Sequence, residues 1–160
     1  ILPPVTMTDA DVEWFLEGTS EEYRNYFEQP NRWAKFGLEA LAGAGGLFRE
    51  DLIPQYGELE DYGEDLKEGR LPPLTDLFSK TDNVIEAGES MKGAVLCHYL
   101  LHGEGGKHRL RFLGLVHDFL LGSSSADALP DALGMSVEDL EKTLQAHTEK
   151  CLEKKPEEKD

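Results

Sequence analysis

The spacing of apolar residues along the chain is typical of α-helices almost throughout. Over residues 83–102 the apolar positions recur at intervals of three and four, which places them on one face of a helix. A second segment with this spacing covers 107–121, and the residues expected on its buried face are Leu110, Leu113, Val116, Phe119 and Leu120. No segment alternates apolar and polar residues as a half-buried strand does. We therefore predict an all-α fold.

The sequence Gly103-Glu104-Gly105-Gly106 separates these two helical segments. A connection of so few residues brings two consecutive helices side by side in opposite directions. We therefore predict an antiparallel helical hairpin over residues 84–121. Residues 83–122 carry four acidic and four basic side chains, so we expect this neutral part of the chain to lie at the centre of the packing.

Helix start and stop signals predict further helices on both sides of the hairpin. The segments that these signals delimit are 8–17, 20–27, 30–43, 125–133 and 136–152, and a short helix follows the extended segment that begins at Leu71. Pro30 is expected in the first turn of its helix, where a missing N–H costs nothing. Pro130 is expected to kink its helix. Ser125 and Ser136 are the expected N-caps of the last two helices.

These segments amount to about six to eight helices, which we expect to form an irregular helical bundle. A chain of 160 residues has the length of one domain. We therefore predict a single helical domain over residues 1–152. Residues 153–160 are almost all charged and have nothing to bury, so we expect a frayed tail there.

Residues 47–73 are the least regular part of the pattern. They contain three prolines and three glycines, and residues 58–68 hold six acidic side chains and one lysine. Such a run is usually a solvated face or a mobile loop. A calcium-binding loop would require acidic residues at alternate positions before a glycine, and that spacing does not occur.

The composition limits the classes of partner. The chain has 16 basic and 32 acidic residues, hence a net charge of −16, and 39% of its residues are hydrophobic. This hydrophobic share is enough for a modest core. The negative charge repels phosphate groups, so we expect neither nucleic acid nor an anionic membrane as a partner. No run of 18 or more apolar residues is present, so we expect no membrane insertion.

The cysteines and the first residues of the chain do not determine the cellular compartment of the protein. Cys97 and Cys151 are the only cysteines, and two cysteines do not make a disulfide framework. Cys97 lies in an apolar run and is expected to be a buried, unreactive thiol. The sequence starts Ile1-Leu2-Pro3-Pro4 without a signal peptide, so we expect an excised or processed domain of a larger protein, which in one interpretation is exported.

His98 and His102 are the candidate metal ligands. Their spacing of four residues on a helix places two imidazoles on one face, as a zinc site requires. Further ligands would have to come from elsewhere in the fold, and Glu104, His108 and Asp118 are the candidates. The alternative is a pair of histidines at the boundary of the core, without a cofactor. The HExxH motif does not occur, so we assign no catalytic residue.

A basic cluster opens the segment 107–121. Lys107, Arg109 and Arg111 lie there beside His108. Positive charges at a helix N-terminus oppose the helix dipole, so we expect these side chains to face acidic groups from elsewhere in the fold. The alternative is that Lys107, Arg109 and Arg111 contact an anion or a partner protein.

A family resemblance covers residues 71–150. The phrase His98-Tyr99-Leu100-Leu101-His102-Gly103-Glu104-Gly105-Gly106-Lys107-His108-Arg109, followed by Leu120-Leu121-Gly122, resembles the C-terminal helical part of gluzincin-type, peptidase MA-like metallopeptidase domains. In that family the two histidines of an HExxH helix bind zinc, the glutamate of this motif is the base, and a glutamate of a later helix is the third ligand. The segment Arg32-Trp33-Ala34-Lys35-Phe36-Gly37-Leu38-Glu39 resembles the later helix, and Glu39 is the residue nearest to its zinc ligand.

Three functional hypotheses follow. The resemblance without the zinc motif implies a non-catalytic helical domain that acts as a scaffold or a protein-interaction module. The alternative is a fragment of a gluzincin-type zinc peptidase whose HExxH lies before Ile1, with zinc as its cofactor. A third hypothesis is a helical adaptor that binds basic peptides through the acidic residues 58–68.

Overall fold

The computed structural model describes residues 30–43, 45, 56–81, 86–122 and 125–153. Helices are the only regular secondary structure in these residues. The helices are α3 (Arg32–Gly43), α4 (Tyr56–Lys67), α5 (Leu74–Ser79), α6 (Ala87–His102), α7 (Arg109–Leu120), α8 (Ala128–Leu133), α9 (Val137–Glu153) and the 3₁₀ helix η1 (Gly103–Gly106). The predicted all-α fold is confirmed for this part of the chain. The helices predicted at 8–17 and 20–27 and the tail after Glu153 lie outside the described residues. No helix in the described ranges is both long and apolar enough to cross a membrane.

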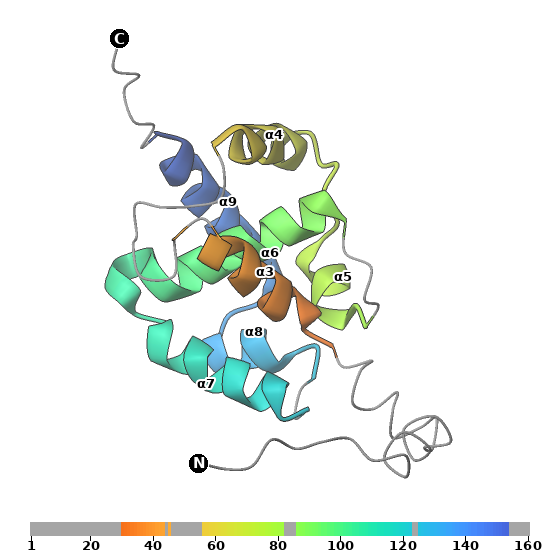
Figure 1. Ribbon diagram of the computed structural model, residues 1–160, viewed down its shortest axis with the longest axis vertical. Helices are drawn as coiled ribbons and strands as arrows, with labels where there is room; N and C mark the ends of the chain where they lie inside the picture. Colours follow the sequence, from red (N-terminus) through yellow and green to blue (C-terminus); the bar gives the residue numbers. More distant parts are fainter. Residues whose placement is uncertain (1–29, 44, 46–55, 82–85, 123–124, 154–160) are drawn as a thin grey trace, which may run out of the picture.

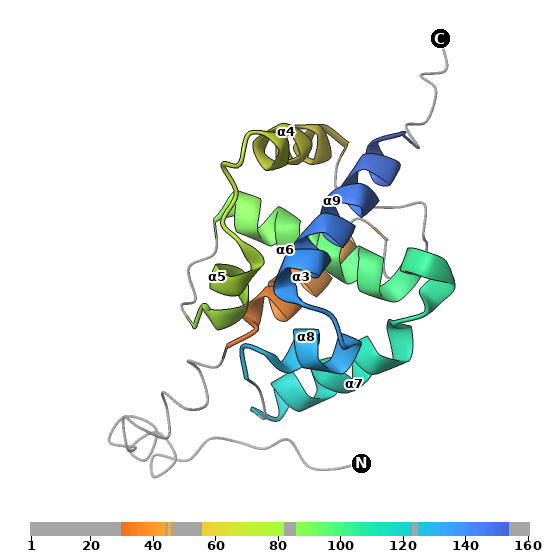
Figure 2. The same ribbon diagram turned by 180° about the vertical axis from the view of Figure 1, so that it is seen from behind.

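Helix α6 is the centre of the molecule. Every residue from Met91 to Leu101 is buried, so this helix is covered on all sides. Figures 1 and 2 show α3 and α9 crossing opposite faces of α6, with α5 near its start and α7 after its end. Within the neutral segment 83–122, α6 thus lies at the centre of the packing as predicted, whereas most residues of α7 are exposed.

Helices α3 and α6 approach each other closely through two glycines. A Cβ atom added to Gly37 would lie 2.5 Å from the carbonyl carbon and oxygen of Gly93. Backbone atoms cannot move aside as a flexible side chain does, so this crossing requires glycine. Trp33 and Leu41 of α3 are buried on either side of it, and the Trp33 ring stacks on that of Phe112 with centroids 6.1 Å apart.

The predicted hairpin is present, but the face predicted for α7 is buried only in part: Val116 and Phe119 pack against the core as predicted. Helices α6 and α7 run in opposite directions (Figures 1 and 2), and the turn uses left-handed backbone at Glu104, Gly105 and Gly106. In α7, however, Leu110 is 85% exposed, whereas Phe112 is fully buried. Apolar residues occupy more than one side of this helix, so periodicity alone did not determine which side meets the core.

The acidic segment in the middle of the chain is helical rather than irregular. Leu59 and Tyr62 of α4 are buried, while Glu60, Asp61 and Glu64 are exposed. The acidic run is therefore a solvated face, one of the two alternatives that the sequence left open, and the other alternative, a mobile loop, is wrong over 56–67. The apolar period was hard to recognise because only a few apolar residues stand among many acids.

Two expected helix starts also differ from the structure. Helix α8 begins at Ala128, so Pro130 falls in its first turn and causes no kink, and Ser125 lies ahead of the helix instead of capping it. Helix α3 likewise begins at Arg32, after Pro30. Ser136 does cap α9, because its hydroxyl oxygen accepts a hydrogen bond from the Asp139 amide at 3.2 Å.

Candidate functional site

A cluster of two histidines and one cysteine lies where α9 crosses α6. Nδ1 of His98 is 2.8 Å from Nε2 of His147, and Sγ of Cys151 is 3.6 Å from the same nitrogen. One ligand atom from each of the three residues lies within 4.8 Å of the corresponding atoms of the other two. We call His98, His147 and Cys151 the His-His-Cys cluster.

The helical period places these side chains together. His147 and Cys151 are four residues apart on α9, and His98 and His102 are four apart on α6, so each helix presents a pair on one face. His98 is 3% exposed and Cys151 is 7% exposed, whereas His147 and His102 are half-buried. The ring centroids of His98 and His102 are 5.0 Å apart. Imidazole nitrogens and a thiolate are the donors that zinc and similar cations prefer.

Tyr99 connects the cluster to the turn after α6. Its ring meets that of His147 edge to face, with centroids 5.3 Å apart, and its hydroxyl donates a 2.9 Å hydrogen bond to Oε2 of Glu104. This hydrogen bond is the main reason why the pKa of Glu104 is lowered. Burial, together with the nearby Glu104 carboxylate, raises the pKa of Tyr99 to about 12. His108 is buried with its Nε2 3.3 Å from the same carboxylate.

The sequence identified only part of this arrangement. His98 is in the core, so the expectation that it lies at the core boundary is wrong. Glu39 and Asp118 are exposed residues of α3 and α7 and do not belong to the group that the structure brings together. Sequence reasoning missed His147 and Cys151 as partners of His98. The signal was present, because their spacing of four residues matches that of His98 and His102.

The two arginines at the start of α7 donate hydrogen bonds to main-chain carbonyls of other helices. Arg109 Nε donates a 2.8 Å hydrogen bond to the Leu101 carbonyl near the end of α6, and Arg111 donates one of 2.9 Å to the Ala132 carbonyl in α8. Carbonyls at a helix C-terminus carry partial negative charge, so these contacts are favourable. Of the basic cluster, His108 meets an acidic side chain, that of Glu104, whereas these two arginine hydrogen bonds go to main-chain carbonyls. Lys107 is exposed.

A buried lysine lies further along the same α6–α9 contact. Lys92 is 2% exposed, and its ammonium group donates hydrogen bonds to the Pro72 carbonyl at 2.7 Å and to Glu141 at 3.1 Å. Glu141 also accepts a hydrogen bond from the first amide of α5, at Leu74. Burial lowers the pKa of Lys92, while Glu141 opposes that shift. Glu141 therefore holds the start of α5 and the ammonium group of α6 against α9.

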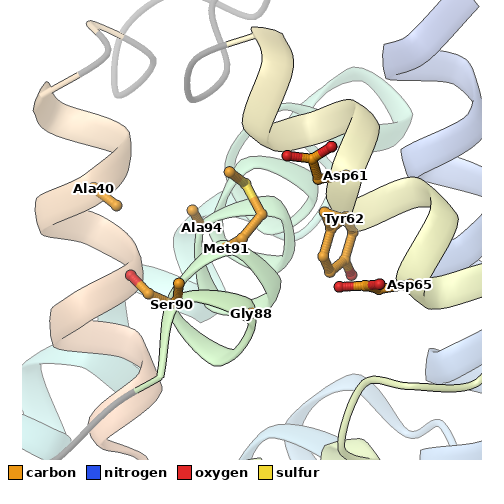
Figure 3. Close-up of a pocket in the computed structure, with 9 residues that line it drawn as sticks. Ala40, Asp61, Tyr62, Asp65, Gly88, Ser90, Met91 and Ala94 are labelled. Atoms are coloured by element: carbon orange, nitrogen blue, oxygen red, sulfur yellow. The ribbon is translucent and has the colours of Figure 1, made fainter.

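A surface pocket lies between α3, α4 and α6. It has a volume of about 290 Å³. The residues that line it are Ala40, Asp61, Tyr62, Asp65, Ala87, Gly88, Ser90, Met91 and Ala94. Figure 3 shows Asp61, Tyr62 and Asp65 on α4 across from Met91 and Ala94 on α6. Met91 and Ala94 are buried and give the pocket an apolar floor, while Asp61 is exposed at its rim.

Comparison of the chain with models of protein families, with curated proteins and with solved structures finds no match. The resemblance to the helical part of gluzincins therefore stays a prediction from the sequence. The features of the described residues that bear on function are the pocket and the polar contacts between α6 and α9.

Proposed function

We propose that this chain is a non-catalytic protein-interaction module that binds a basic side chain of a partner protein in the pocket between α3, α4 and α6. The observation that carries the proposal is the combination of an apolar floor and a carboxylate at the rim. The floor, formed in part by Met91 and Ala94, suits the aliphatic stem of a lysine or arginine. The Asp61 carboxylate suits its charged end.

The charge of the surroundings supports a basic partner. The chain carries a net charge of −16, and the exposed acids of α4, among them Glu60, Asp61 and Glu64, lie beside the pocket. A negative surface of this kind accelerates encounter with a positively charged partner and disfavours an acidic one.

A guanidinium already binds at the edge of the pocket. Nη2 of Arg70 lies 2.6 Å from Asp65, and both side chains are partly exposed. Exposed ion pairs of this kind are worth only about 0–1 kcal/mol, so a partner's basic group exchanges with Arg70 at little cost. Asp61 is the carboxylate that we assign to the partner, and Asp65 is shared with Arg70.

The proposal is tested by titrating the chain with a short peptide rich in lysine and arginine and following the NMR signals of Met91 and Ala94. We expect saturable shifts at these residues, and we expect Asp61→Asn to weaken binding by about tenfold, the usual effect of losing one charged hydrogen bond. Asp118→Asn, on α7, is the matched control because it changes the net charge equally. Equal weakening by both substitutions would show only general attraction and would contradict the proposal.

The alternative hypothesis, a fragment of a zinc peptidase, stays a prediction of the sequence resemblance. Glu39, the residue nearest to a gluzincin ligand, is exposed on α3. The residues encoded before Ile1 test this hypothesis directly. An HExxH motif there would support it over the interaction module.

A further inference from the structure

We infer that the His-His-Cys cluster is a zinc site that fastens α9 to α6, with His102 completing the set of ligands. This site is separate from the pocket of the proposed function: Cys151 lies near the end of α9, and the pocket residues come from α3, α4 and the first half of α6. The inference therefore does not depend on whether a basic partner binds.

Two of the distances within the cluster lie close to those of a tetrahedral site, and the ligand atoms of His98 and Cys151 lie within 4.8 Å of each other. With zinc–nitrogen bonds of about 2.0 Å and zinc–sulfur bonds of about 2.3 Å, a tetrahedral site separates nitrogen from sulfur by about 3.5 Å and two nitrogens by about 3.3 Å. The Cys151 sulfur is 3.6 Å from His147 Nε2, which matches this geometry. The nitrogens of His98 and His147 are 2.8 Å apart, so they separate by about half an ångström when an ion replaces the proton between them.

Each helix contributes two donors at the spacing that such a site uses. His98 and His102 on α6 face in one direction, and His147 and Cys151 on α9 meet His98 from the other helix. His102 lies outside the three residues whose ligand atoms converge, but it is half-buried with its ring centroid 5.0 Å from that of His98, so we assign it to the fourth position. Four protein ligands make a closed site, which is typical of structural zinc rather than of catalysis.

The other cysteine provides a contrast within the same helix. Cys97 precedes His98 but lies on the opposite face of α6, with its sulfur 3.9 Å from the Ala34 carbonyl of α3. Its side chain is completely buried in the contact with α3, so it does not face the residues of α9. Only Cys151 is therefore placed to bind the ion, and it releases its proton when it does so.

Cobalt provides a test, because Co²⁺ binds in the place of zinc and absorbs light. The full 160-residue chain, prepared without a histidine tag, is titrated with Co²⁺. We expect one equivalent to give the charge-transfer band of a cobalt–thiolate bond and the strong visible bands of tetrahedral cobalt, and we expect Zn²⁺ to displace both. His147→Gln should weaken binding of Zn²⁺ at least about 100-fold, and His102→Ala should weaken it less.

Substituting each of the two cysteines in turn identifies the sulfur ligand, even if one of the two variants fails to fold. Cys151→Ser should abolish the charge-transfer band, and Cys97→Ala should keep it. His117→Gln, at an exposed histidine of α7, is the control for general binding by imidazole. If the wild-type chain gives no thiolate band, or if the band is lost in Cys97→Ala and kept in Cys151→Ser, the site does not exist. In the first case the His98–His147 contact would be only a buried hydrogen bond.

Discussion

The two faces of α6 are built in different ways. Towards α3, the contact is close and depends on shape: Gly37 meets Gly93, and Cys97 lies against a backbone carbonyl. Towards α9, the contact consists of polar pairs, in which Lys92 meets Glu141 and His98 meets His147. The first contact therefore tolerates no added volume, whereas each polar group of the second requires a partner.

This difference determines what each face of α6 requires of the groups that form it. A close contact of backbone against backbone holds two helices rigidly and has little to exchange with solvent. A contact of imidazole, thiol and ammonium groups is stable only when each group is paired, and a metal ion is one way of pairing them. We therefore expect the α9 face of α6, and not its α3 face, to respond to metal ions.

The largest expected effect is that of Gly37→Ala on the α3 face. The added Cβ meets the backbone of Gly93, so we expect the free energy of unfolding to fall by about 3 kcal/mol, measured by denaturant unfolding. Gly114→Ala in α7 is the matched control, because a Cβ there meets nothing within 4 Å. Alanine is the better helix former, so this control should gain up to about 1 kcal/mol. Similar losses in both variants would contradict the close α3–α6 contact.

The second prediction concerns the ion pair on the α9 face. Glu141→Ala leaves the ammonium group of Lys92 buried with only the Pro72 carbonyl and removes the acceptor of the Leu74 amide. We expect a loss of about 2 kcal/mol, less than for a fully buried pair because Glu141 is partly exposed. The double variant Lys92→Met, Glu141→Leu should recover most of the lost stability, since two apolar side chains leave no buried charge without a partner. If the double variant loses as much stability as the single variants Lys92→Met and Glu141→Leu lose when added together, the two groups are not coupled.

The smallest expected effect is a pH dependence at the turn after α6. The pKa of Glu104 is lowered in the folded state, so its contribution to stability is present above the ordinary glutamate pKa and is lost as the pH falls through the lowered value. Tyr99→Phe removes the main cause, and the pKa of Glu104 should rise towards its ordinary value. Carbon-detected NMR titration of the Glu104 carboxyl measures the shift. An unchanged pKa in the variant would show that the Tyr99 hydroxyl is not the cause.

The sequence predicted the elements of the fold better than their contacts. The positions of α6, α7 and α9 follow from apolar spacing and helix ends, which are local properties. The burial of Phe112 in place of Leu110 depends on which side of α7 meets Trp33, and no local pattern contains that information. Helix α4 was missed because its few apolar residues stand among acids.

The candidate site shows the same limit. His98 and His102 were recognised as a pair from their spacing, but the residues that lie beside His98 are His147 and Cys151, about fifty positions later in the chain. Their proximity depends on how α9 crosses α6. The spacing of His147 and Cys151 was a visible signal, but spacing does not say which pairs meet.

Amide hydrogen exchange with and without Zn²⁺ tests the contrast between the two faces of α6 most directly. We predict that one equivalent of Zn²⁺ slows exchange in the last turns of α6 and α9, around His98–His102 and His147–Cys151, and leaves α3 unchanged. Exchange that is unaffected by Zn²⁺, or that is slowed equally in α3 and α9, would contradict the assignment of a metal site to the α9 face.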